Sequence, residues 1–86
     1  MMFSLTGKAA IVTGGGSGIG GAIAQRLRAA GADVLVADIR DHGSDVAAWG
    51  GAFRQTDCSK PEDVQALCDD AMARFGKLDI MVNNAG

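Results

Sequence analysis

The feature that most constrains this chain is a glycine-rich loop, Thr13-Gly14-Gly15-Gly16-Ser17-Gly18-Ile19-Gly20, which joins an apolar run to an Ala-rich segment. The run, residues 8–12, is short and almost continuously apolar, which is typical of a strand buried on both faces. Residues without a Cβ let the backbone approach a ligand closely, and a helix start offers unpaired N–H groups that suit a phosphate. The loop therefore predicts either a dinucleotide pyrophosphate on Gly18, Ile19 and Gly20, or only a tight strand-to-helix turn.

A second apolar run, Val34 to Ala37, is closed by Asp38. Asp38 follows the loop at about the separation at which a carboxylate meets an adenosine ribose. This spacing strengthens the interpretation of the loop as a nucleotide site.

Strand and helix patterns alternate through the rest of the chain. We expect strands over residues 8–12, 34–37, 52–56 and 78–82, and helices over residues 17–30, 41–49 and 59–75. This alternation implies an α/β fold with a parallel sheet, right-handed crossovers and helices on both faces. The third strand is the least apolar, which favours a place at the sheet edge.

Two of the helices have an apolar stripe that we expect to face the sheet. In the first helix the stripe consists of Ile19, Ala22, Ile23, Ala24, Leu27 and Ala30. In the third it consists of Val64, Leu67, Cys68, Ala71, Met72 and Phe75. Ser59 and Glu62 fit a capping box at the start of the third helix, with Pro61 in its first turn. Gly31 and Gly76 are placed to end the first and third helices.

Four single residues have simple structural interpretations. Trp49 lies at helical spacing and is interpreted as core rather than as a stacking platform. His42 has no second ligand-type neighbour and is expected to be an exposed loop residue. Cys58 and Cys68 lack the spacing of a zinc site, so we expect two small, partly buried thiols and no metal.

Composition excludes several classes of function. The net charge is −2 and the charges are dispersed, which gives no basic surface for nucleic acid. No apolar run is long enough to span a bilayer, and no signal peptide is recognisable at the N-terminus. We therefore expect a cytoplasmic protein with no membrane partner.

Four features, in order, resemble the N-terminal part of a short-chain dehydrogenase/reductase: the glycine loop, Asp38, Asp57-Cys58 after the third strand, and Asn83-Asn84-Ala85-Gly86. The resemblance covers essentially the whole chain and implies one partial Rossmann-type domain, residues 1–86, of about four strands and three helices, truncated. It also implies that the loop holds a pyrophosphate and that Asp38 bonds both ribose hydroxyls. A carboxylate there repels a 2′-phosphate, and the loop contains no Arg or Lys, so NAD is favoured over NADP. Arg40 is the one residue that could soften this preference.

The resemblance assigns further contacts. It places Asp57 at the adenine edge through its side chain and Cys58 through its backbone, although Asp57 could equally be only a turn residue. Asn84 is the expected ligand neighbour, Asn83 a structural residue, and Thr13 an anchor that ties the loop to this stretch. The candidate cofactor-binding residues are Gly14, Gly16, Ser17, Gly18, Ile19, Gly20, Asp38, Asp57, Cys58, Asn84, Ala85 and Gly86.

Members of this family use a Tyr and a Lys four residues apart, with a Ser, to transfer a proton and polarise the carbonyl. This chain has no tyrosine, so we name no catalytic residue and expect no turnover by the chain alone. Three hypotheses follow: a fragment of an NAD-dependent oxidoreductase, a stand-alone dinucleotide-binding module, or an interaction fragment without ligand. An open edge on the fourth strand predicts self-association or a partner that covers it.

Overall fold

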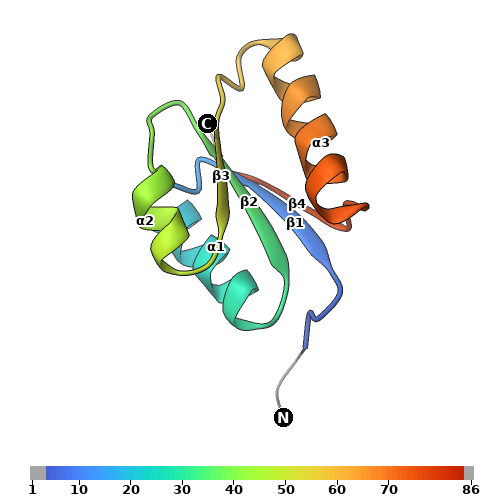
Figure 1. Ribbon diagram of the computed structural model, residues 1–86. Helices are drawn as coiled ribbons and strands as arrows, with labels where there is room; N and C mark the ends of the chain where they lie inside the picture. The colour runs from blue at the N-terminus through green and yellow to red at the C-terminus, as the bar shows by residue number, and fades with distance from the viewer. Residues whose placement is uncertain (1–3, 85–86) are drawn as a thin grey trace.

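The computed structural model describes residues 4–84, which form a four-stranded parallel sheet with helices on both faces (Figure 1). The strands are β1 (Ala9–Thr13), β2 (Asp33–Asp38), β3 (Ala52–Gln55) and β4 (Ile80–Asn83). The helices are α1 (Gly18–Ala29), α2 (Gly43–Ala48) and α3 (Pro61–Phe75). The expected α/β fold with four strands and three helices is confirmed.

The strand order is β3-β2-β1-β4, and every neighbouring pair is parallel. β1 is buried along its whole length and β2 along most of it, as their continuous apolar runs predict. The more polar β3 lies at an edge, also as predicted. Because all four strands are parallel, their carboxyl ends meet at one edge of the sheet.

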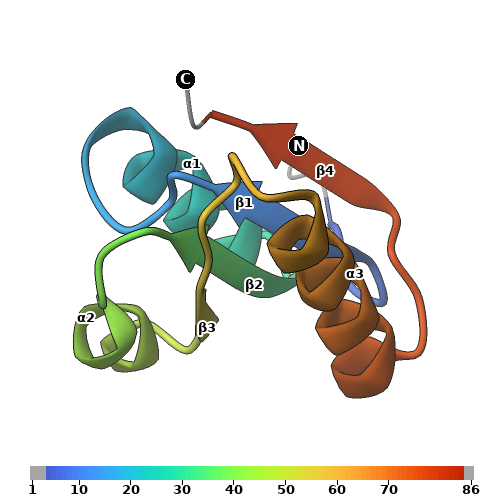
Figure 2. The same cartoon turned by 90° about the horizontal axis from the view of Figure 1, so that it is seen from above.

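Two clusters of side chains form the core, one on each face of the sheet. On one face α1 and α2 pack against the sheet through Ala24 and Val46, and Trp49 joins this cluster as a partly buried residue. On the other face α3 packs through Leu67 and Ala71. Figure 2 shows α1 and α2 on one side of the strands and α3 on the other.

The predicted helix stripes are wrong at three positions. Ile19 is 76% exposed, Met72 is 50% exposed, and Ala22 is also exposed. The buried residues of α1 are Ala24, as predicted, and Gly20 and Gly21, which the stripe did not include. Both helices cross a narrow sheet, so only the central part of each apolar stripe finds a partner.

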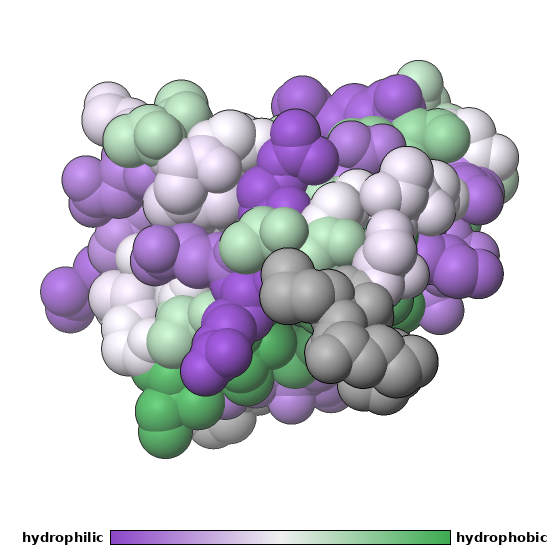
Figure 3. All heavy atoms as spheres, turned by 90° about the horizontal axis from the view of Figure 1, so that it is seen from below, coloured by the Kyte–Doolittle hydropathy of each residue, from purple (hydrophilic) through white to green (hydrophobic). Residues whose placement is uncertain are grey.

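Part of the apolar face of α1 is therefore exposed. It surrounds a shallow depression lined by Ile19, Ala22, Ile23, Arg26 and Leu27. Seen from below, hydrophobic surface gathers at one lower edge of a face that is otherwise mixed (Figure 3).

The predicted capping box of α3 is also wrong. Lys60 occupies the position before the helix and makes no side-chain cap. The Ser59 hydroxyl instead donates to Asp57 at 2.6 Å, and Asp63 in the first turn accepts from the Asp57 N–H at 3.0 Å. Pro61 does lie in the first turn, as expected, and Gly76 ends α3 in a left-handed conformation with φ 74°.

No helix formed by residues 4–84 has both the length and the apolar character that crossing a membrane requires.

Candidate functional site

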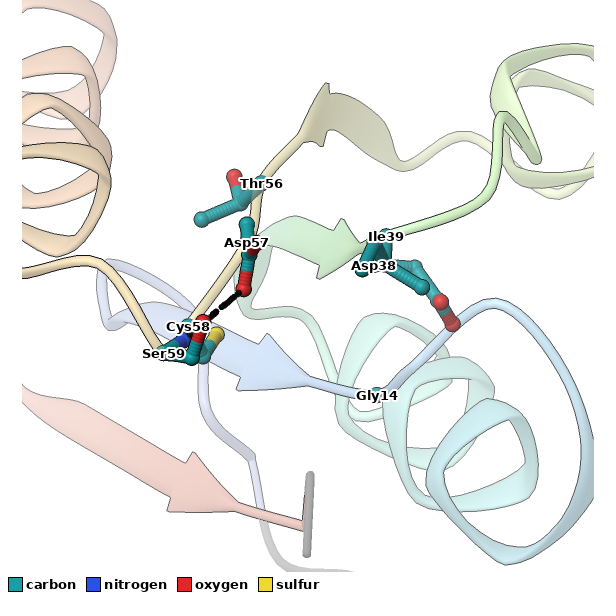
Figure 4. Close-up of a pocket in the computed structure, with 7 residues that line it drawn as sticks. All are labelled: Gly14, Asp38, Ile39, Thr56, Asp57, Cys58 and Ser59. Atoms are coloured by element: carbon teal, nitrogen blue, oxygen red, sulfur yellow. Dashed lines mark hydrogen bonds between the residues drawn. The ribbon is translucent and has the colours of Figure 1, made fainter.

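A cleft of about 420 Å³ opens at the carboxyl ends of β1, β2 and β3. It is lined by Gly14, Asp38, Ile39, Thr56, Asp57, Cys58 and Ser59. Figure 4 shows that these residues come from three different connections, with Asp38 directed toward the glycine loop and Asp57 toward Ser59. The parallel topology thus brings three of the predicted segments to one place.

The glycine loop is tied to β2 before it enters α1. The N–H of Gly14 donates to the carbonyl of Ala37 at 2.7 Å, and Gly14 has a positive φ of 65°. Gly18 also has a positive φ, 60°, and a Cβ built on it would meet nothing within 4 Å. Open space above a left-handed glycine is what close approach of a ligand to the backbone requires.

Gly20 has the opposite reason to be glycine. A Cβ there would overlap the Gly14 carbonyl and the Asn84 side chain. The missing side chain therefore lets α1 begin directly against the loop.

The start of α1 offers backbone donors to the site. The helical ladder begins with the Gly21 N–H, which donates to the Ser17 carbonyl at 3.0 Å. The N–H groups of Gly18, Ile19 and Gly20 precede this ladder and have no acceptor within the helix. Ser17 has extended backbone and its hydroxyl makes no cap, so the N-terminal turn is available to an anion and suits a pyrophosphate.

Asp38 joins the glycine loop to the end of β2. Its Oδ2 accepts from the Gly16 N–H at 3.1 Å, and its Oδ1 accepts from the Arg40 N–H at 3.4 Å. The side chain is 18% exposed, so the carboxylate is held between two backbone donors while part of it still reaches the cleft.

Asp57, Cys58 and Ser59 form the opposite wall of the cleft. The hydroxyl and the backbone N–H of Ser59 both donate to Asp57, and these bonds hold the pKa of Asp57 below its usual value. This is the geometry of the turn interpretation, although the residue also lies on the cleft wall as the binding interpretation needs. Burial raises the pKa of the Cys58 thiol, and the nearby carboxylates raise it further, so Cys58 is a poor nucleophile at neutral pH.

Thr13 anchors the end of β1 to the end of β4, as predicted. Its hydroxyl lies 3.1 Å from Asn83 Oδ1 and accepts from the Asn84 N–H at 3.1 Å. The Asn84 amide in turn donates to the Gly14 carbonyl at 3.4 Å. Asn83 and Asn84 thus both brace the glycine loop. The predicted contacts of Ala85 and Gly86 lie outside the described residues.

The prediction of an exposed His42 is wrong. Its side chain is 20% exposed, and Nε2 lies 3.8 Å from Asp38 Oδ2. The ring also meets Phe53 edge-on, with centroids 6.3 Å apart. The polar sequence around His42 gave no signal of this, because the fold of the β2–α2 connection turns the ring back over the loop.

Sequence reasoning also missed three residues of the cleft, Ile39, Thr56 and Ser59. Ile39 is 61% exposed at the rim, and an apolar residue directly after a strand-terminal acid is a signal that could have found it. Thr56 is buried, and its N–H donates to the Asp38 carbonyl at 2.8 Å. Among residues 4–84 no group of three or more His, Cys, Asp or Glu side chains could hold a metal ion.

Comparison with known proteins agrees with this geometry. A family model described as short chain dehydrogenase matches residues 8–86. A 2,5-dichloro-2,5-cyclohexadiene-1,4-diol dehydrogenase of Sphingobium indicum is 51% identical over 88 residues, which cover 98% of this chain and 35% of the relative.

Two solved structures share the fold. A hydroxysteroid dehydrogenase from Escherichia coli has a TM-score of 0.85 and 40% identity, with 96% of this chain and 38% of that chain covered. A 3-ketoacyl-(acyl-carrier-protein) reductase from Brucella melitensis, complexed with NADH, has a TM-score of 0.86 and 36% identity, with 91% and 34% covered. The chain therefore spans little more than a third of these proteins. With the family model matched from residue 8 to residue 86, the chain belongs to the short-chain dehydrogenase/reductase family and corresponds to an N-terminal portion of its members.

Proposed function

We propose that this chain binds NAD(H) and is the dinucleotide-binding portion of an oxidoreductase that transfers hydride between NAD and a carbonyl or alcohol. The observation that carries the proposal is the hydrogen bond between the Gly16 N–H and Asp38 Oδ2, 3.1 Å long. It joins a candidate phosphate loop to a candidate ribose carboxylate that lines the cleft. The solved relative that is complexed with NADH supports the same cofactor.

The charges at the ribose end favour NAD over NADP. Asp38 presents a carboxylate where a ribose hydroxyl donates, and the same carboxylate repels a 2′-phosphate. The glycine loop contributes no positive side chain to offset this repulsion. Arg40 contacts Asp38 through its backbone N–H.

The protein's part in hydride transfer is to bind, orient and exchange a proton, and the cofactor supplies the hydride chemistry. The 86 residues contain no tyrosine, and Cys58 is held as a thiol. We therefore expect the isolated chain to bind the dinucleotide without turnover.

Calorimetric titration of the chain with NAD and NADP tests the cofactor. Asp38→Asn should weaken NAD binding about ten-fold, because a hydrogen bond to a charged group contributes roughly 1.5–3 kcal/mol and one to a neutral amide oxygen roughly 0.5–1.5 kcal/mol. The same substitution should also reduce the difference between the affinities for NAD and NADP. Asp69→Asn removes the same charge from an exposed position on α3 and should change neither affinity. Equal effects of the two substitutions would refute the ribose assignment.

A further inference from the structure

His42 lies where the loop, the ribose carboxylate and β3 come together. Its Nε2 is 3.8 Å from Asp38 Oδ2, the oxygen that also accepts from the Gly16 N–H. A Cβ on Gly16 would overlap the imidazole ring, so the ring lies directly against the loop backbone. Phe53 also meets the ring edge-on, with the ring centroids 6.3 Å apart. The imidazole is therefore fixed beside the carboxylate rather than free in solvent.

The charged residues on the elements around His42 leave Asp38 as its partner. They are Asp38 and Arg40 at the end of β2, Asp41 and Asp45 beside and within α2, and Arg54 next to Phe53 on β3. The Asp41 carboxylate accepts from the Gly43 N–H at 2.9 Å, and Arg54 pairs with Asp70 on α3 at 3.4 Å. Residues 13–20 of the glycine loop carry no charge. Among the described residues, the ion pair available to a protonated His42 is the one with Asp38.

We propose that His42 is a positioning residue that makes the choice between NAD and NADP depend on pH, through its contact with Asp38. This inference rests on the proposed function. With a neutral imidazole, the Asp38 carboxylate repels a 2′-phosphate at full strength. With a protonated imidazole, a positive charge beside Oδ2 offsets the carboxylate and stands next to the place that a 2′-phosphate would take. Discrimination against NADP therefore weakens as the pH falls and the imidazole takes up a proton.

The 2′-phosphate of the ligand also takes up a proton as the pH falls. A phosphate monoester takes up its second proton near pH 6, which weakens its repulsion by Asp38 without any help from His42. The contribution of His42 is therefore the part of the pH effect that disappears when the imidazole is replaced.

The first experiment is calorimetric titration of the 86-residue chain with NAD and with NADP at pH 8.0 and pH 5.5. It compares the natural chain with His42→Gln, which is polar and uncharged, and with His42→Phe, which keeps an edge contact with Phe53. The ratio of the NADP to the NAD dissociation constant should fall about five-fold more in the natural chain than in either variant, the size of a modest ion-pair effect. Circular dichroism establishes which variants are folded.

A second readout needs no variant. His42 is the only histidine of the chain, so its ring resonances can be followed by NMR without overlap. If protonation of His42 favours NADP about five-fold, then by reciprocity bound NADP moves the midpoint of the imidazole titration upward by about 0.7 pH unit relative to bound NAD.

The outcomes distinguish the role of His42 from NAD binding itself. An equal pH effect in all three chains, or the same NMR midpoint with both ligands, overturns the role of His42 while NAD binding stands. Failure of the natural chain to bind NAD at pH 8.0 overturns the proposed function and this inference with it. A larger pH effect in the natural chain, with distinct NMR midpoints, supports both.

Discussion

Gly20 and Gly21 are neighbours in α1 but meet different surroundings. A Cβ on Gly20 would overlap the Gly14 carbonyl and the Asn84 amide, whereas a Cβ on Gly21 would find its nearest neighbour, the Gly15 carbonyl oxygen, at 3.5 Å. Gly20→Ala should therefore lower the free energy of unfolding by about 1–3 kcal/mol through overpacking, and weaken NAD binding by displacing the loop. Gly21→Ala should be neutral or stabilising by up to about 1 kcal/mol, since alanine favours a helix. Urea unfolding measures the stability of both variants. Equal losses of unfolding free energy would mean that the glycine loop does not pack against α1 as described.

At this scale the sequence predicted where residues lie when their position follows from the local chain. Asp38 could be placed because it closes an apolar run, and Gly18 because it lies in a glycine-rich run between a strand and a helix. His42 could not, since its position depends on contacts with Gly16 and Phe53 that only the folded β2–α2 connection creates. Thr56 was missed for a similar reason, because its backbone bond to Asp38 depends on the pairing of β2 with β3.

Among the elements, α3 provides a contrast between buried and exposed apolar residues. Leu67 is fully buried against the sheet, whereas Met72 is 50% exposed. Leu67→Ala should cost about 2–5 kcal/mol of stability because it leaves a cavity. Met72→Ala should change stability by less than about 0.5 kcal/mol, as exposed substitutions usually do. Guanidinium unfolding of both variants provides the measurement, and a large loss for Met72→Ala would contradict its exposed position.

The start of β4 is fixed by Asp79. Its Oδ2 accepts from the Ala9 N–H at 2.9 Å, and its own N–H donates to the Ala9 carbonyl at 2.9 Å. The bond from Ala9 is the main cause of a pKa of Asp79 below the ordinary value of 3.8, and Lys77 adds to it. A carboxyl whose pKa is lowered on folding stabilises the protein above the unfolded pKa, and this contribution is lost as the pH falls through the folded pKa.

We therefore expect the natural chain to lose stability between about pH 5 and pH 2 more steeply than Asp79→Asn does. Asp57, whose pKa is also lowered, contributes in the same direction and is unchanged in this comparison. Unfolding midpoints measured at several pH values test this. Parallel pH profiles for the two chains would show that Asp79 does not support β4 through its charge.

The order and type of the elements could be predicted, but not the details of how their ends are capped. The alternation of apolar runs with amphipathic segments, and glycines such as Gly76, gave the strands and helices within a few residues of their observed bounds. The capping box failed because Ser59 is used by Asp57 in the preceding turn. The stripes of α1 and α3 extended too far because periodicity shows which residues share a face and not how much of that face is covered.

For the whole molecule, the main consequence is an apolar face that residues 4–84 do not cover. It combines the side of α1 around Ile19 and Ile23 with the edge of β4, whose ladder in the described structure is formed with β1 alone. On the α1 side of the sheet, Ile80 and Val82 of β4 are only partly buried. A free strand edge beside exposed apolar side chains favours association.

We expect copies of the isolated chain to associate through the apolar face of α1 and the edge of β4. Ala22 and Ala73 are both exposed helix residues, but Ala22 borders the apolar depression and Ala73 lies on α3. Ala22→Glu would place a charge inside an apolar contact and should leave the chain monomeric, because burying an unpaired charge is costly. Ala73→Glu adds the same charge elsewhere and should associate like the natural chain. Sedimentation velocity over a range of concentrations shows whether the natural chain and each variant are monomeric or associated. A natural chain that stays monomeric at every concentration, or equal association by both variants, would refute this interface.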